Sequence, residues 1–497
     1  MTTNYPDDSY SLHTDFYQIN MMKVYWDDGI AEKKAVFEAY FRSMPFNAGF
    51  AVFAGLERVI TYIQNLKFTE SDIAYLRETT DYPEDFLTYL SEFKFKGKIR
   101  SMREGEIVFN NEPLFQVEAG LAECQLIETA VLNALNYQTL IATKASRIRY
   151  VAGPNASVME FGTRRAQEFD AALWGTRSAY IGGFDSTSNV RAGKLFDIPV
   201  SGTHAHAMIQ AYKDEYVAFT KYATSHKDCV FLVDTYDTLH SGIPNAIKVA
   251  NEFGDKINFV GIRIDSGDLS FLSKKAREML DDAGYPNAKI VASNDLDENM
   301  IMHLMAQNAC IDVWGVGTKL ITAYDQPSLG GVYKMVAIED ENGQYMDTIK
   351  LSSNSSKVTT PGRKNVFRII DNQSKRSEGD YITLAEESME GIETLTMFHP
   401  VHSYIQKDVS NFTAQELLQD IFIDGELVYQ LPTVHEIKEF AKENKKVLWD
   451  EYRRISNPEE YPVDLSDKCW ENRNENIKSV RDHVKETTSV HFDRPSL

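Results

Sequence analysis

The sequence predicts an α/β fold: an irregular TIM-like (β/α) barrel, with an α+β domain before it and a polar region after it. Two observations lead to this prediction. Short apolar runs recur about every 20 to 30 residues within residues 143–350, with helical patterns between them. Each run is followed by a cluster of small, polar or charged residues. A doubly wound open sheet is the main competing architecture, because it has the same strand–helix alternation.

Length, composition and charge narrow the class of protein. The chain has 497 residues, of which 43% are hydrophobic and 25% charged, and it carries 27 Phe and 25 Tyr. These values are typical of a globular protein with two or three domains and exclude a long disordered chain. The net charge of −21 opposes binding to nucleic acid or to an anionic membrane. No apolar stretch reaches the roughly 18 residues of a membrane span.

The cysteines and the N-terminus indicate a cytoplasmic protein. None of the four cysteines belongs to a CxxC pair, and Cys229 and Cys310 open apolar runs. We expect all four to be reduced structural residues. The N-terminal segment MTTNYPDDSYSLHTD is acidic and polar, and it lacks the basic start and apolar core of a signal peptide.

Three regions differ in their residue patterns. Residues 1–142 are predicted as an α+β domain, with a strand at 35–41, a helix at 51–66, a hairpin-like strand pair at 106–117 and a helical stretch at 123–149. Residues 143–350 form the predicted barrel. Residues 351–497 are more polar, with surface helices expected at 434–446 and 474–486 and a flexible loop at SSNSSK, residues 352–357.

Seven apolar runs of the middle region are interpreted as strands. In order they are ASVMEF, SAYIGGF, IPVSG, CVFLVD, INFVGIRID, AKIVAS and IDVWGVG. Helical periodicity lies between them: Leu272, Ala276, Met279 and Leu280 share one helix face, and Gly284 follows as a stop signal. This alternation predicts parallel strands joined by right-handed crossovers.

Polar residues of this region gather after the strands and not before them. The clusters are EFGTRR, GGFDSTS, VSGTHAH, LVDTYDT, IRIDSGDL, ASNDLDE and WGVGTK. In a (β/α) barrel the loops at the carboxyl ends of the strands build the active site. Any single cluster has an alternative as a turn or helix cap, because Asp, Ser, Thr and Asn favour both. Seven clusters together, with His and Arg among them, favour a functional site.

The residue types in these loops indicate an anionic substrate. Gly315 and Gly317 let the backbone approach a ligand closely and expose N–H groups to it. Ser293 and Asn294 lead into a helix, whose N-terminus favours phosphate. Three arginines can hold a carboxylate or phosphate through paired hydrogen bonds, or can pair with a neighbouring Asp; they are Arg164, Arg165 and Arg263.

Two histidines, His204 and His206, lie in the THAH segment. A metal site is one interpretation, but the pair falls where a strand enters a helix, so the side chains diverge, and no third ligand follows at typical spacing. A nucleophilic or general-base histidine, oriented by Thr203 or a nearby Asp, is the favoured reading. A capping or core histidine is the structural alternative.

Four carboxylates follow two neighbouring predicted strands: Asp234, Asp237, Asp265 and Asp268. They can bind Mg²⁺ through oxygen ligands, orient ribose hydroxyls or remain solvated turn residues. The chain lacks a P-loop, a GxGxxG opening a βα unit, a GxSxG elbow and the kinase motifs, so a nucleotide would need another arrangement.

Longer motifs extend over nearly the whole chain. They include LHTDFYQINMM, EFGTRRAQ, GTHAH, LVDTYDT, IRIDSGDL, ASNDLDE, WGVGT and KVTTPGRKNVFRI. With these motifs the chain resembles the nicotinate phosphoribosyltransferases. The resemblance implies transfer of a phosphoribosyl group from phosphoribosyl pyrophosphate to nicotinate, giving nicotinate mononucleotide and pyrophosphate for NAD salvage. It also implies coupling to ATP hydrolysis through a phosphohistidine, a requirement for Mg²⁺ and a homodimer.

The resemblance also implies roles for individual residues. His206 matches the phosphohistidine, whereas His204 falls where the family varies. Nicotinate is expected to contact Tyr17, Arg164, Thr203 and Arg263. The resemblance assigns Thr318 to the phosphate of the phosphoribosyl group. When the loop residues inferred above are added, the expected contacts of the phosphoribosyl and phosphate groups are Asp265, Ser293, Asn294, Gly315, Gly317 and Thr318. In the family the N-terminal region of one subunit closes the barrel mouth of the other, which would bring Tyr17 from a partner chain. The metal ligands stay unassigned.

Two alternatives to nicotinate transfer stay open. The nearer one is phosphoribosyl transfer to nicotinamide or quinolinate, although a neutral amide would leave a buried Arg unpaired at a cost of a few kcal/mol, roughly. The other is a non-catalytic regulator on the same scaffold, against which the intact THAH and RIDSGDL motifs argue.

Overall fold

The computed structural model describes residues 10–352 and 357–487, and the chain divides into two compact units. Unit 1 consists of Met1–Tyr137, Leu329–Leu431 and Glu443–Leu497, and unit 2 of Gln138–Ser328 and Pro432–Lys442. This division joins the N-terminal and C-terminal regions that the sequence treats as separate, because their strands share one sheet. The start of the N-terminal segment and most of SSNSSK lie outside the described residues.

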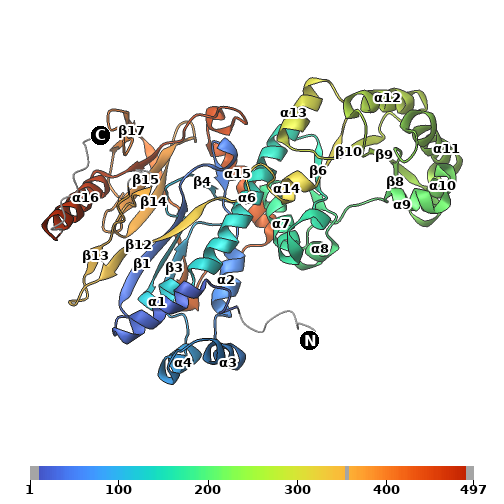
Figure 1. Cartoon of the computed structure of the whole chain (residues 1–497). Helices are drawn as coiled ribbons and strands as arrows, with labels where there is room; N and C mark the ends of the chain where they lie inside the picture. The colour runs from blue at the N-terminus through green and yellow to red at the C-terminus, as the bar shows by residue number, and fades with distance from the viewer. Residues whose placement is uncertain (1–9, 353–356, 488–497) are drawn as a thin grey trace, which may run out of the picture. The chain divides into compact units, whose positions relative to one another are not determined.

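The larger sheet of unit 1 is antiparallel, in the order β13-β12-β1-β5-β3-β19-β20 (Figure 1). Its strands are β1 (Lys34–Phe41), β3 (Lys98–Ser101), β5 (Phe115–Gly120), β12 (Gly331–Glu339), β13 (Tyr345–Asp347), β19 (Gln419–Ile423) and β20 (Glu426–Leu427). The expected strand at 35–41 is confirmed as β1. The expected hairpin at 106–117 is wrong, because β4 (Ile107–Val108) pairs with β2 (Ala51–Val52) while β5 pairs with β1 and β3.

The helices of the N-terminal region follow the sequence more closely. They are α1 (Phe16–Asp27), α2 (Leu56–Gln64), α3 (Glu70–Thr79), α4 (Glu84–Ser91), α5 (Leu121–Leu126) and α6 (Glu128–Ala152). The helix expected at 51–66 begins only at Leu56, because residues 51–52 form β2 and Gly55 has a left-handed φ of 110°. The helical stretch at 123–149 is confirmed as α5 and α6.

The C-terminal region contributes a second sheet to unit 1, in the order β18-β14-β15-β21. Its strands are β14 (Lys364–Asp371), β15 (Ser377–Leu384), β18 (Phe412–Glu416) and β21 (Val463–Leu465), and a separate hairpin consists of β16 (Thr394–Phe398) and β17 (Gln406–Ser410). The two surface helices expected in this region are confirmed as α15 (Val434–Asn444) and α16 (Asp467–Thr487). The sequence did not predict these strands.

Unit 2 is built on a six-stranded parallel sheet in the order β7-β6-β11-β10-β9-β8, with helices on its outer side (Figure 1). The strands are β6 (Ser157–Glu160), β7 (Ser186–Thr187), β8 (Asp228–Leu232), β9 (Asn258–Ile264), β10 (Lys289–Ser293) and β11 (Val313–Val316). The helices are α7 (Glu168–Gly182), α8 (Val190–Phe196), α9 (His206–Tyr212), α10 (Glu215–Ser225), α11 (Ile243–Phe253), α12 (Leu269–Asp282), α13 (Glu298–Ala306) and α14 (Thr318–Ile321).

Two of the seven predicted strands of this region are wrong. Most of SAYIGGF continues α7, which ends at Gly182 before a left-handed Gly183, and IPVSG contributes only an isolated bridge between Thr187 and Val200. Among the described residues the sheet keeps two edges, at β7 and β8, so it forms a half-barrel and not a closed ring of hydrogen-bonded strands. The strands nevertheless follow one another as in a barrel, from β8 through β11 to β6 and β7, with a gap between β7 and β8. A doubly wound sheet instead reverses its strand order at a switch point.

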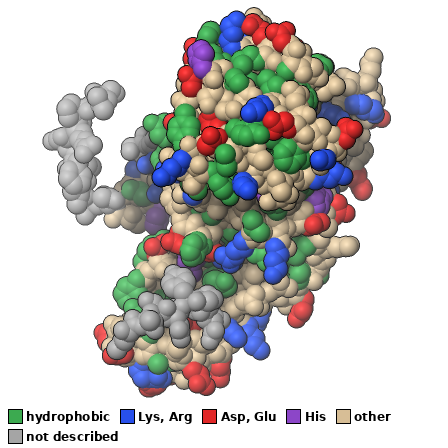
Figure 2. Space-filling model, turned by 90° about the vertical axis from the view of Figure 1, so that its right-hand side faces the viewer, with side chains coloured by type: hydrophobic (Ala, Val, Ile, Leu, Met, Phe, Trp, Pro, Cys, Tyr) green, Lys and Arg blue, Asp and Glu red, His purple; other side chains and the backbone are tan. Residues whose placement is uncertain are grey.

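The surface and the cysteines fit the expectations from composition. No helix in the described part of the chain is long and apolar enough to cross a membrane. The four cysteines are free thiols, and Cys124, Cys229 and Cys469 are buried. Acidic and basic side chains are interspersed over the face that Figure 2 displays, with hydrophobic side chains between them.

Candidate active site

The carboxyl ends of the parallel strands of unit 2 share one edge of the sheet, and all but one of the predicted site residues belong to this unit. Strands β10 and β11 are paired in register as far as Ser293 and Gly315. Arg164 lies in a 3₁₀ turn after β6, Asp265 directly follows β9, and Thr318 begins α14 after β11. This placement agrees with the rule that ligands bind outside the carboxyl ends of parallel strands.

Arg263, near the end of β9, is held by three neighbours. Its guanidinium donates to a carboxylate oxygen of Asp265 at 2.9 Å and to the hydroxyl of Ser293 at 2.9 Å. It also lies over the ring of Phe161, 5.6 Å from the centroid. The Ser293 hydroxyl donates in turn to Asp265. The guanidinium is therefore fixed in orientation while its side chain keeps 20% of its surface exposed.

His206 is the first residue of α9 and lies against the same carboxylate. Its Nδ1 is hydrogen-bonded to the hydroxyl of Thr235 at 3.0 Å, and its Nε2 lies 3.9 Å from Asp265 Oδ2. The imidazole is 38% exposed. A histidine with one ring nitrogen bonded to a hydroxyl and the other facing a carboxylate has a fixed ring orientation, which a nucleophile or base needs.

The four candidate carboxylates divide into two kinds. Asp237 accepts hydrogen bonds from the backbone N–H groups of residues 239 and 240, and Asp268 caps α12 by accepting from residue 271. Asp234 instead accepts from the backbone N–H of Asp265 at 2.9 Å and from the hydroxyl of Ser266 at 2.6 Å. Its Oδ1 is buried without a hydrogen-bond partner among the described residues. Asp265 thus lies against Arg263 and Ser293, with Asp234 bonded to its backbone, whereas the other two aspartates are helix caps.

His204 is a structural histidine. Its Nε2 accepts a hydrogen bond from the backbone N–H of Leu232 at 3.3 Å, and aromatic rings of Phe219 and Tyr222 lie within about 6 Å of it. Burial is the main cause that lowers the pKa of His204 to about 4, so the ring is neutral at pH 7. The two histidines of THAH diverge, and no group of three or more His, Cys, Asp or Glu in the described residues is arranged to hold a metal.

The remaining predicted residues lie in loops at the same edge or outside unit 2. Arg164 and Arg165 are exposed and make no ion pair among the described residues. The Thr203 hydroxyl makes one long contact, 3.5 Å, with the carbonyl of His204. Tyr17, with 51% of its surface exposed, belongs to α1 in unit 1, so unit 2 does not bring it together with the other site residues.

The two loops predicted to hold phosphate have unusual backbones. Asn294 and Asp295, directly after β10, have left-handed φ values of 102° and 43°. Gly315 leaves no room for a side chain, because a Cβ there would lie 2.6 Å from the ring of Phe161. Gly317 lets the chain pass close to the Phe161 carbonyl before α14 begins. Backbone of this kind persists where surrounding structure holds it, and it is common at ligand sites.

Three site residues were not singled out from the sequence: Phe161, Thr235 and Ser266. Each lies within one of the polar motifs after a predicted strand, and Thr235 and Ser266 directly follow the candidate carboxylates Asp234 and Asp265. The signal for Thr235 is its position directly after Asp234, on a strand end beside β9. Nothing in the local sequence indicates that the ring of Phe161 supports an arginine about 100 residues later.

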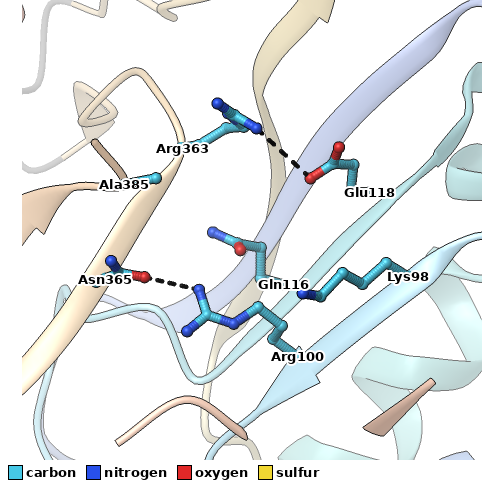
Figure 3. Close-up of a pocket in the computed structure, with 7 residues that line it drawn as sticks. All are labelled: Lys98, Arg100, Gln116, Glu118, Arg363, Asn365 and Ala385. Carbon is cyan, nitrogen blue, oxygen red and sulfur yellow. Dashed lines mark hydrogen bonds and ion pairs between the residues drawn. The ribbon is translucent and has the colours of Figure 1, made fainter. Parts of the chain in front are cut away.

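A separate pocket of about 200 Å³ lies in unit 1 and is lined by Lys98, Arg100, Gln116, Glu118, Arg363, Asn365 and Ala385 (Figure 3). Arg100 points toward Asn365 and donates to it at 2.7 Å. The three cationic side chains that line the pocket are each paired with a carboxylate: Lys98 with Asp420, Arg100 with Glu416 and Arg363 with Glu386. Because the positive charge is already compensated, we interpret this pocket as a polar junction between strands.

Comparison with known proteins places these motifs in one family. The descriptions that match in succession are the nicotinate phosphoribosyltransferase N-terminal domain over residues 12–136, the nicotinate phosphoribosyltransferase family over 156–369 and its C-terminal domain over 363–473. The chain is 63% identical to the nicotinate phosphoribosyltransferase of Bacillus subtilis over 482 residues, covering 97% of this chain and 98% of that protein.

The likeness extends to distant relatives and to structure. The human nicotinate phosphoribosyltransferase is 31% identical over 515 residues, covering 92% of this chain and 95% of that protein. The crystal structure of human nicotinic acid phosphoribosyltransferase superimposes with a TM-score of 0.83 at 30% identity, covering 93% of this chain and 99% of that one. The chain belongs to the nicotinate phosphoribosyltransferase family.

Proposed function

We propose that this chain transfers the phosphoribosyl group of phosphoribosyl pyrophosphate to nicotinate, the transferase reaction of NAD salvage after which its family is named, and couples it to ATP hydrolysis through His206. The observation that carries the proposal is one connected group of side chains at the strand ends: Arg263, Asp265, Ser293 and His206. This group combines a fixed cation for an acid substrate with a fixed imidazole for phosphoryl chemistry.

Arg263 is the proposed partner of the nicotinate carboxylate. Its guanidinium is positioned by Asp265 and Ser293 and is supported by Phe161, so it can receive a carboxylate without reorganising. A carboxylate held there would aim the ring nitrogen at C1 of the phosphoribosyl group. In the transfer, the nitrogen–C1 bond forms and the bond from C1 to the pyrophosphate oxygen breaks.

The phosphoribosyl side is proposed for the loops after β10 and β11, with Asn294, Gly315, Gly317 and Thr318. Mg²⁺ commonly accompanies phosphate substrates and takes oxygen ligands. The residues present fit such an ion, because Asp234 has a buried carboxylate oxygen without a partner among the described residues. We therefore propose Asp234, with Asp265 next to it, as the ligands, and the ion would neutralise charge on the pyrophosphate that leaves.

His206 is proposed to carry the phosphoryl group. The Nε2 nitrogen faces Asp265, which favours the proton on Nε2 and leaves the lone pair on Nδ1, beside the Thr235 hydroxyl. Nδ1 would attack the γ-phosphorus of ATP, so the nitrogen–phosphorus bond forms and ADP leaves. Water later breaks that bond and releases phosphate. The added negative charge beside Asp265 would change the electrostatics of the site between the two states.

An irregular barrel, a homodimer and a cytoplasmic location complete the proposal. The segment from Pro199 to His206 is hydrogen-bonded to β7 through Thr187, and His204 and His206 bond to residues 232 and 235, at and just after the end of β8. This support suggests that the segment closes the gap in the half-barrel. The exposed Tyr17 would complete the site of a partner subunit. Four free cysteines are typical of a reducing compartment.

A turnover assay in which nicotinate, phosphoribosyl pyrophosphate and ATP are each omitted tests the function, with nicotinamide and quinolinate as competing substrates. The His206→Ala variant should lose nicotinate-dependent ATP hydrolysis and retain slow nicotinate mononucleotide formation. His226→Ala is the matched control, because that histidine is exposed and precedes β8, at the end of the strand opposite the candidate site. Transfer of labelled phosphate from ATP to the His206→Ala protein would overturn the assignment.

A further inference from the structure

Two loops of the candidate site are adjacent, and no backbone hydrogen bond joins them in the described part of the chain. The first follows β10 and contains Asn294; the second follows β11 and contains Gly317 and Thr318. Their strands are paired only up to Ser293 and Gly315, although β11 continues to Val316 beside β6. Beyond that point side-chain ion pairs connect the two segments.

One ion pair joins the loops directly. Lys319, in α14, donates to Asp297 at 2.8 Å, and Asp297 also caps α13 by accepting from the backbone N–H of Met300. Both side chains are partly exposed, 25% for Lys319 and 15% for Asp297. An ion pair this accessible to water stabilises an arrangement only modestly.

A second connection is buried and centres on Lys144 in α6. Its ammonium lies 2.8 Å from Glu298, the first residue of α13, and 2.8 and 2.9 Å from the two carboxylate oxygens of Asp325, in the turn after α14. Lys144 is 1% exposed, as is Glu298. One buried cation therefore links the segment after β10 to the segment after β11.

Arg147 makes this arrangement testable. It lies one turn further along α6 and donates to the other oxygen of Glu298 at 2.8 Å. If Lys144 lost its charge, Glu298 would still face a buried cation, and Asp325, whose side chain is 43% exposed, would be solvated. Removal of Lys144 therefore abolishes the buried link between the loops, and leaves only the more exposed Lys319–Asp297 pair, without creating an uncompensated buried charge, which is the usual reason for severe destabilisation.

We propose that Lys144 is a positioning residue that sets the spacing of the two phosphate-binding loops by holding Glu298 and Asp325 together. The inference rests on the proposed phosphoribosyl site at these loops. A shift of about 1 Å in a phosphate contact weakens substrate positioning strongly, so the link should matter for phosphoribosyl pyrophosphate and little for nicotinate, which binds at Arg263.

The test is steady-state kinetics of the full chain with Asp325→Asn, Lys144→Met and the double variant. Asp325→Asn changes only the half-exposed end and should raise the KM for phosphoribosyl pyrophosphate roughly tenfold, with the nicotinate KM unchanged within about twofold. Lys144→Met should have the same effect, and the double variant should be no worse than either single variant, because all three remove one link.

The control is Arg277→Met, which removes a different ion-paired cation of unit 2, on the outer helix α12. It should leave both KM values unchanged. An unaltered phosphoribosyl pyrophosphate KM in Asp325→Asn, or equal increases for both substrates, would overturn the positioning role. If the unmodified protein forms no nicotinate mononucleotide, the proposed function fails instead, so the two failures are distinguishable.

Discussion

Truncation of Arg263 tests whether the site selects an acid. The guanidinium is 20% exposed and is fixed by Asp265, Ser293 and the ring of Phe161. In Arg263→Ala the nicotinate carboxylate would lose its cation, and Asp265 would lose a neighbour whichever substrate is bound. The second effect lowers the rate with every substrate. The acid-specific effect is therefore the difference between the loss of kcat/KM with nicotinate and the loss of kcat/KM with nicotinamide.

The expected size follows from the burial of the pair. Loss of one partner from a buried, hydrogen-bonded charge pair costs about 2 to 5 kcal/mol. Because one fifth of the Arg263 side chain reaches solvent, water screens part of the interaction, and a value near the lower limit, about 2 kcal/mol, is appropriate. At 1.36 kcal/mol for each tenfold change, this corresponds to a roughly 30-fold loss in the ratio of kcat/KM for nicotinate over nicotinamide.

The assay measures initial rates of mononucleotide formation with both substrates at several concentrations. Arg277→Ala is the matched control, because its side chain is 21% exposed and is paired with Asp281, but it lies on the outer helix α12. The ratio should fall in Arg263→Ala and stay constant in Arg277→Ala. A parallel loss of both activities in Arg263→Ala, with the ratio preserved, would refute the role in acid recognition.

Two further changes test the surroundings of this site. Gly315→Ala places a Cβ 2.6 Å from the Phe161 ring that supports Arg263, and it also alters the proposed phosphate loop, so the KM values for nicotinate and for phosphoribosyl pyrophosphate should both rise several-fold; initial rates with each substrate varied in turn would show it. The pKa of His204 is about 4 in the folded protein and about 6.5 when unfolded, so its contribution to stability is present above pH 6.5 and is lost as the pH falls toward 4. Urea unfolding of His204→Gln should lack up to about 3 kcal/mol of this acid sensitivity, and an identical pH profile would contradict the buried neutral ring.

Much of unit 2 could be predicted because its strands are continuous apolar runs followed by polar ends. The two exceptions have physical reasons. SAYIGGF is as apolar as a strand, but it completes a helix that began at Glu168, and apolar periodicity alone does not separate the two in a short segment. The actual edge strand, Ser186–Thr187, is two polar residues long and carries no such signal.

Unit 1 was less predictable because its sheets depend on pairing between distant segments. Strand β1 was clear from AVFEAYF, yet its neighbour β12 lies about 300 residues away, and β3 pairs with β19 across a similar separation. Local patterns give the strands but not their partners. The same limit applies to the site, where Arg263 and Phe161 meet only because β9 and β6 belong to one sheet.

The aspartates of the site show how position within a loop separates binding from capping. Three loops carry two aspartates each, and in each the later one caps the next helix: Asp237, Asp268 and Asp297 accept from backbone N–H groups two or three residues on. In the loops after β8 and β9 the earlier aspartates, Asp234 and Asp265, instead bond to groups that follow the neighbouring strand or lie at its end, whereas Asp295, the earlier one after β10, has a left-handed φ of 43°. A capping carboxylate has its acceptor sites used by its own helix, whereas a strand-end carboxylate meets its neighbours at the shared edge of the sheet. In the loops after β8 and β9, position relative to the strand end therefore separates the aspartates that meet the neighbouring strand from those that cap a helix.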